Sequence, residues 1–131
     1  MKVKQISVFI ENQPGRLVAM LEVLKAKNID ICALAVSETT DFGIVRMIVS
    51  DTPLAIKSLR EANFTIKETT VLKQEIPDNP GGLLDTIARP LTEAGINIEY
   101  FYAFLDTSPN KATIIVKVSD PDQAENILRD S

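Results

Sequence analysis

The chain has 131 residues, 45% of them hydrophobic and 24% charged, a composition typical of a folded globular protein. Its net charge of −4, without clustered Lys or Arg, argues against nucleic acid as a partner, because phosphate binding requires grouped cations. The sequence has no histidine, which removes the commonest general base at neutral pH and the commonest metal ligand. Catalysis, a cofactor and a metal are therefore not expected, and small molecules or proteins are the expected partners.

Membrane and export signals are not evident in the sequence. No apolar run approaches the roughly 20 residues that span a bilayer, and the N-terminal residues do not form a signal-peptide pattern. The single cysteine, Cys32, has no second thiol for a disulfide or a metal motif and is expected to be a small buried apolar residue. A cytoplasmic protein that does not act at a membrane is the resulting expectation.

The first half of the chain predicts a strand, a helix, a hairpin, a second helix and a last strand. Residues 4–10 have the period-2 pattern of a half-buried strand, and an apolar stripe with helical spacing follows Pro14 and Gly15. The remaining elements are a hairpin of residues 29–37 and 42–50, a helix over 54–62 and a strand over 64–69. The order βαββαβ is the ferredoxin-like arrangement.

The second half repeats the first. Asn12-Gln13-Pro14-Gly15 returns as Asp78-Asn79-Pro80-Gly81, and Asn28-Ile29-Asp30-Ile31 returns as Gly95-Ile96-Asn97-Ile98. The offset is 66 residues at the first motif and 67 at the second, so each copy is expected to be a compact unit with its own core. The elements predicted in this copy cover residues 71–76, 82–94, 96–105, 112–118 and 122–129, in the order βαββα.

The predicted fold class is therefore α+β, with two ferredoxin-like βαββαβ units in tandem, residues 1–69 and 70–131, the second lacking its last strand. Residues 64–76 form one nearly continuous strand pattern, so no linker is expected. Pro90 lies inside the second copy's helix, where it should remove a backbone hydrogen bond and kink the helix. The one residue by which this helix exceeds that of the first copy is expected at the same place. Residues 71–76 would keep an unpaired edge, and a homodimer that covers this edge or a sheet face is expected.

The two motifs, repeated at matched spacing, resemble the ACT domain, an amino-acid-sensing module of biosynthetic enzymes. The resemblance covers nearly the whole chain and implies a free-standing tandem ACT protein without a catalytic domain. In this family, ligands lie where two domains pack side by side, between the first strand–helix loop of one domain and the second strand of its neighbour. Carried over by position, the resemblance implies ligand contacts from Asn12, Gly15, Asp30, Asp78, Gly81 and Asn97.

The chemistry of these positions suits an α-amino acid. A glycine beside a helix N-terminus lets a carboxylate approach unpaired N–H groups, and Asp30 or Asp78 offers an acceptor for the ammonium group. The alternative is structural: Asn12 and Asp78 satisfy helix-start donors, the two glycines allow tight packing, and Asp30 and Asn97 are solvated strand ends.

Three acidic residues also have two interpretations. Asp106, Asp120 and Asp122 could together bind a hard metal ion, because such ions prefer carboxylate ligands. The segment Asp120-Pro121-Asp122 is more typical of a helix cap, which is the preferred interpretation.

Aromatic residues crowd into the strand predicted over 96–105. Strict alternation places Tyr100 and Tyr102 on one face of the sheet with Ile98, and Phe101 on the other face. The tyrosines either pack in a core or line a pocket for the ligand's side chain.

Three functions remain open on the sequence alone. The preferred one is a binding module that senses an amino acid and regulates amino-acid metabolism through a partner enzyme or regulator. The alternative is a dimerising scaffold or regulatory subunit of a metabolic enzyme that has lost the ligand. A small ferredoxin-like enzyme is disfavoured, because the sequence lacks histidine and any evident nucleophile–base pair.

Overall fold

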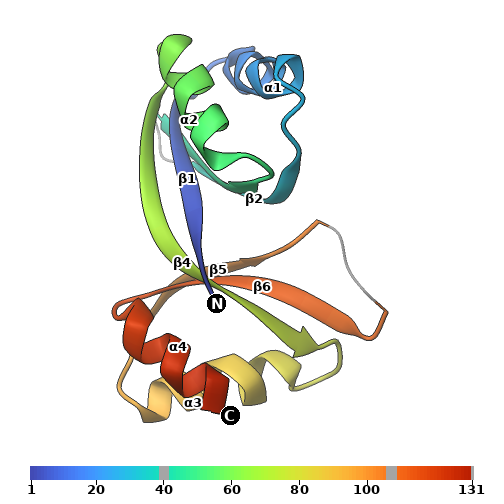
Figure 1. Cartoon of the computed structure of the whole chain (residues 1–131), viewed down its shortest axis with the longest axis vertical. Helices are drawn as coiled ribbons and strands as arrows, with labels where there is room; N and C mark the ends of the chain where they lie inside the picture. Colours follow the sequence, from blue (N-terminus) through green and yellow to red (C-terminus); the bar gives the residue numbers. More distant parts are fainter. Residues whose placement is uncertain (39–41, 106–108, 131) are drawn as a thin grey trace. The chain divides into compact units, whose positions relative to one another are not determined.

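The structure is a computed structural model of the whole chain, and it describes residues 1–38, 42–105 and 109–130. Its elements are β1 (Lys2–Glu11), α1 (Arg16–Ala26), β2 (Ile31–Glu38), β3 (Phe42–Val49), α2 (Thr52–Glu61), β4 (Thr65–Pro77), η1 (Leu84–Ala88), α3 (Arg89–Glu93), β5 (Ile98–Ala103), β6 (Lys111–Val118) and α4 (Pro121–Asp130). Figure 1 shows β4 as one long strand, which ends the first βαββαβ series and begins the second. The predicted tandem α+β fold is confirmed.

The chain forms two compact units along this order. The first unit is Lys4–Thr69, and the second unit consists of Met1–Val3 together with Thr70–Ser131. Strand β4 passes from one unit to the other without a linker, as the continuous strand pattern predicts.

The first unit has the strand order β2-β3-β1-β4, with α1 and α2 on one face of the sheet (Figure 1). Strands β1 and β3 are antiparallel, and Val8 lies opposite Val45 in the register. The core lies between this face and the helices, where Met20 and Leu24 of α1 pack with Leu59 of α2. The period-2 and helical patterns of the sequence both point their apolar residues into this layer.

The second unit continues the order with β4-β6-β5, also antiparallel. Its core is built in the same way, from Leu72 of β4 and Val116 of β6 against Ile87, Leu91 and Leu128 of the helices.

The edge of β4 in the second unit is paired at Lys73, so the prediction that residues 71–76 keep an unpaired edge is wrong at this residue. The Lys73 N–H donates a 2.8 Å hydrogen bond to the carbonyl oxygen of Met1. The chain's own first residues therefore occupy the place of the strand that the second copy lacks. A contact across 72 residues of sequence is invisible to local pattern analysis, which explains the error.

Helix α4 holds these first residues in place. The Lys2 N–H donates to Glu125 Oε2 at 2.9 Å, and Lys2 Nζ donates to Asp122 Oδ1 at 2.6 Å. The hydrogen bond to Asp122 and its negative charge raise the pKa of Lys2 above the ordinary value of 10.5. The end of the second unit thereby fixes the start of the chain.

The second helix of each copy begins with the same cap. Asp51 Oδ1 accepts from the Leu54 N–H at 3.1 Å, and Asp120 Oδ1 accepts from the Gln123 N–H at the same distance. The helix-cap interpretation of Asp120 is confirmed, while Asp106 lies outside the described residues. Within the described residues, no group of three or more acidic, Cys or His side chains could hold a metal ion.

The extra residue of the second unit's first helix lies next to Pro90, as predicted. Residues Leu84–Ala88 form a π-helical turn, and a short α-helix continues from Arg89. In a regular α-helix the proline ring would clash with the carbonyl of the residue four positions earlier, Thr86, and would leave that carbonyl without its donor. The wider π-turn accommodates one additional residue immediately before Pro90.

Candidate ligand site

The loop between first strand and first helix has the same backbone in both copies. Gly15 and Gly81 adopt φ angles of +89° and +92°, a left-handed conformation that favours glycine. A Cβ atom added at Gly15 would have no neighbour within 4 Å, and one at Gly81 would only touch Asp85 Oδ2 at 3.4 Å. Backbone conformation therefore requires these glycines, and the alternative of tight packing does not apply to them.

Close packing instead involves Gly82, a residue that sequence reasoning missed. A Cβ atom there would lie 2.1 Å from the carbonyl oxygen of Pro77. The equivalent residue of the first unit is Arg16, whose guanidinium carbon lies 4.9 Å from the centre of the Phe64 ring. The repeat therefore diverges at this position.

The loop residues Asn12 and Asp78 are exposed to solvent. In the described parts of the chain, neither α1 nor η1 has a side-chain hydrogen bond at its cap. The Asp78 N–H donates to the Asn110 carbonyl at 3.0 Å, which fixes the backbone and leaves the carboxylate at the surface. The capping alternative is therefore not seen, and both side chains face outward from the loop.

The second pair of predicted residues, Asp30 and Asn97, lies where β2 and β5 begin. Their N–H groups donate to the Oγ atoms of Ser50 and Ser119, at 2.9 and 3.3 Å, and their carbonyls accept from the same serines' N–H groups, at 2.9 and 3.1 Å. The backbone is thus held at both positions, while the side chains are exposed. Each residue lines a hollow, of about 280 Å³ at Asp30 and about 470 Å³ at Asn97.

The two predicted sets of residues do not meet within the first unit. Asn12 and Gly15 precede α1, whereas Asp30 follows it, and 11 helical residues span about 16 Å. In the second unit, Gly81 and Asn97 line two different hollows, which share only Ile98. A ligand that contacts both Gly81 and Asn97 of one unit would therefore have to extend from one hollow into the other.

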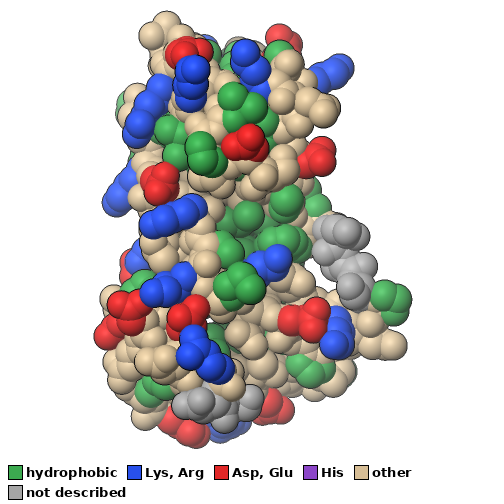
Figure 2. Space-filling view, in the orientation of Figure 1, with side chains coloured by type: hydrophobic (Ala, Val, Ile, Leu, Met, Phe, Trp, Pro, Cys, Tyr) green, Lys and Arg blue, Asp and Glu red, His purple; other side chains and the backbone are tan. Residues whose placement is uncertain are grey.

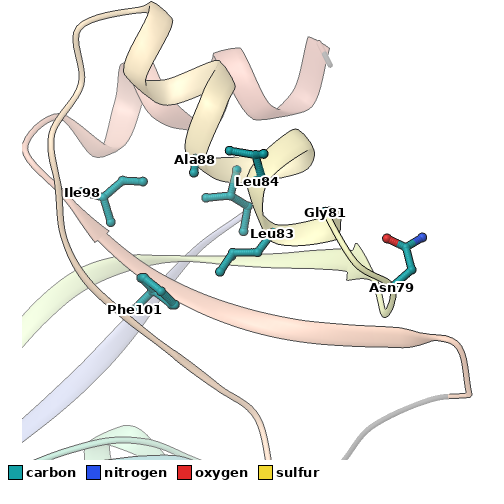
Figure 3. Close-up of a pocket in the computed structure, with 8 residues that line it drawn as sticks. Asn79, Gly81, Leu83, Leu84, Ala88, Ile98 and Phe101 are labelled. Atoms are coloured by element: carbon teal, nitrogen blue, oxygen red, sulfur yellow. The ribbon is translucent and has the colours of Figure 1, made fainter.

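The hollow at Gly81 has a volume of about 460 Å³, and we call it the π-turn pocket. It is lined by Asn79, Gly81, Leu83, Leu84, Ile87, Ala88, Ile98 and Phe101. Figure 3 shows Ile98 and Phe101 of β5 across from the leucines of the helix, with Asn79 on the loop at the far end. Its size is that of a small-molecule site.

The arrangement of β5 corrects the predicted faces of the aromatic residues. A register shift between Ile98 and Tyr100 places Phe101 opposite the core residue Val116, and Tyr102 opposite Ile115. Such a bulge adds one residue to the strand and inverts every side chain after it. Phe101, rather than the tyrosines, therefore lines the pocket beside Ile98.

The tyrosines lie on the opposite face, where Tyr100 and Tyr102 stack with ring centres 6.5 Å apart.

A register shift also occurs between Ile31 and Ala33 of the first unit, at the same place in the repeat. Cys32 lies at that shift and is half-buried, so the expectation of full burial is wrong.

Basic and acidic side chains are intermixed on the face shown in Figure 2, consistent with the net charge of −4. None of the described helices is long and apolar enough to cross a membrane.

These observations define a class of protein: a tandem pair of ferredoxin-like domains with matching loops and strand starts. The chain belongs to the ACT domain family, because the family model described as an ACT domain pair matches residues 1–131. The resemblance noted in the sequence is confirmed. ACT domain pairs are regulatory rather than catalytic domains. No curated protein matches the sequence significantly.

Solved structures agree with the family. The chain is 37% identical to protein BT0572 from Bacteroides thetaiotaomicron, with a TM-score of 0.92, over 99% of this chain and 88% of that one. It shares its fold with the regulatory subunit of aspartate kinase from Thermus thermophilus, at 18% identity and a TM-score of 0.68, over 98% and 91% of the chains. A third structure, aspartate kinase from Synechocystis, has 20% identity and a TM-score of 0.60, over 98% of this chain and 24% of that one.

Proposed function

We propose that this protein is a non-catalytic sensor that binds a free amino acid and regulates amino-acid metabolism through a partner. The observation that carries the proposal is the π-turn pocket, which opens beside the Gly81 loop of an ACT domain. Two of the similar structures are the regulatory subunit of an aspartate kinase and an aspartate kinase, which supports a metabolic enzyme or regulator as the partner. The proposed location is the cytoplasm.

The proposed contacts are those of the loops and strand starts, namely Asn12, Gly15, Asp30, Asp78, Gly81 and Asn97. The backbones of Asp30, Asp78 and Asn97 are held by hydrogen bonds, Gly15 and Gly81 have left-handed conformations, and the polar side chains of the set are exposed. Since the loop and strand start of one domain lie at opposite ends of a helix, we propose that a second copy of the chain completes the site. The proposed assembly is a homodimer.

The test is a thermal-shift screen of the full chain against the 20 common amino acids at high concentration, followed by calorimetry. A ligand at 100 times its Kd stabilises the folded state by about 2.7 kcal/mol, which gives a clear rise in melting temperature. Light scattering with and without the ligand measures the assembly. Failure of every amino acid to shift the melting temperature would refute the sensor and leave the ligand-free scaffold.

Two variants test the proposed contacts directly. Asp30→Asn changes the strand start, and Asn12→Ala changes the loop at the other end of the helix. Asp30→Asn keeps the shape of the side chain and removes the charge that opposes an ammonium group. Because the Asp30 backbone is held by Ser50, the melting temperature without ligand should not change. Equal affinity of the wild type and both variants would contradict the proposed contacts.

A further inference from the structure

The π-turn pocket lies where the second copy differs in structure from the first. The hydrogen bonds at the strand starts and at the second-helix caps match between the copies. The first helix does not match: α1 is a regular α-helix over Arg16–Ala26, whereas the second copy has the π-turn Leu84–Ala88. Three of the residues that line the pocket belong to this turn. The π-turn in its wall is therefore a feature of the second unit.

The walls of the pocket are apolar and incompletely covered. Leu84 is 48% exposed and Phe101 is 51% exposed, on opposite sides of the hollow. An apolar group placed between them would remove hydrocarbon from water on both walls, which is favourable in proportion to the area covered. Exposed apolar side chains that line a concave site mark a place for an apolar ligand group.

The polar groups of the pocket are confined to one end. Asn79 offers an amide that both donates and accepts hydrogen bonds, and none of the described residues lining the pocket is ionisable. A charged ligand side chain between Leu84 and Phe101 would lose water without gaining a partner, which is strongly unfavourable. The pocket therefore distinguishes apolar from charged side chains.

We propose that the π-turn pocket makes the second unit selective for α-amino acids with aliphatic or aromatic side chains, an inference that rests on the proposed function. The amino and carboxylate groups of the ligand lie toward Asn79 and Gly81, and its side chain lies against Leu84, Ile98 and Phe101. Leu84 and Phe101 are then specificity-determining residues, although neither belongs to the sequence motifs of the repeat.

The experiment is calorimetry on the full chain with leucine, methionine, phenylalanine, lysine and aspartate as separate ligands. The matched variants are Leu84→Gln and Val18→Gln, which lie at equivalent positions of the two copies. Val18 is 56% exposed, so both substitutions replace exposed helix residues and should leave the fold intact. We expect an apolar amino acid to bind, Leu84→Gln to weaken it at least tenfold, and Val18→Gln to leave its affinity unchanged.

Each contrary result has a distinct meaning. Binding of lysine or aspartate with an affinity that Leu84→Gln does not change overturns this inference and leaves the sensor function standing. Loss of apolar binding in Val18→Gln, but not in Leu84→Gln, also overturns it, because the site would belong to the first unit. If none of the 20 amino acids of the thermal-shift screen binds, the proposed function and this inference are refuted together.

Discussion

Substitution of Gly82 by alanine should destabilise the protein by about 2 kcal/mol. The added Cβ would lie 2.1 Å from the Pro77 carbonyl oxygen, far inside ordinary contact distance. Because the clashing atom belongs to the backbone at the end of β4, it cannot rotate away as a flexible side chain would. Overpacking of this kind costs up to about 3 kcal/mol. Alanine restricts the conformations of the unfolded chain more than glycine does, which stabilises the folded state by up to about 1 kcal/mol. The difference between these two effects is a net destabilisation of about 2 kcal/mol.

Urea unfolding followed by circular dichroism measures this loss. With a typical slope of about 2 kcal/mol per molar urea, the midpoint should fall by about 1 M. The slope should not change, since the variant keeps the same core.

The matched control is Gly95→Asn, which places the first unit's residue into the second. Gly95 has φ of +75° and would have no atom within 4 Å of an added Cβ, and its counterpart Asn28 has φ of +58°. Asparagine tolerates this conformation, so the control should lose less than about 0.5 kcal/mol. An unchanged midpoint for Gly82→Ala, or equal losses in both variants, would show that the contact with Pro77 does not constrain this helix.

Two further experiments test contacts described above. Glu125→Ala removes the acceptor of the Lys2 N–H, so the Lys73 amide should exchange with solvent about tenfold faster by NMR, and unchanged exchange would contradict the pairing with Met1. A double-mutant cycle of Arg16→Met with Phe64→Leu should give a coupling of about 0.5–1 kcal/mol in urea unfolding, whereas a coupling of zero would show that the cation–π contact contributes nothing.

Much of the fold could be predicted because its signals are local. The cap at Asp120, the helix disturbance at Pro90 and the continuous β4 each depend on residues within a few positions of one another. The duplication strengthened the signal of the cap, since Asp51 and Asp120 make the same hydrogen bond.

The parts that could not be predicted depend on distant pairing. The inversion of Phe101 and Tyr102 follows from the register of β5 against β6, which the sequence of β5 alone does not contain. The place of Met1 beside Lys73 likewise requires the assembled unit. For the candidate site, the motifs indicated the Gly81 loop, but Leu84 and Phe101 of its pocket were missed.

The pairing of Met1–Val3 with β4 makes the second unit a discontinuous domain into which the first unit is inserted. During synthesis on the ribosome, Lys4–Thr69 can complete its core before Thr70–Ser131 has been made. Met1–Val3 remain unpaired during this time. The second unit closes only when Lys73 and Glu125 have emerged. A gene fragment that begins at Thr70 would therefore encode an incomplete domain, and a circular permutant that joins the two segments of the second unit would restore its continuity.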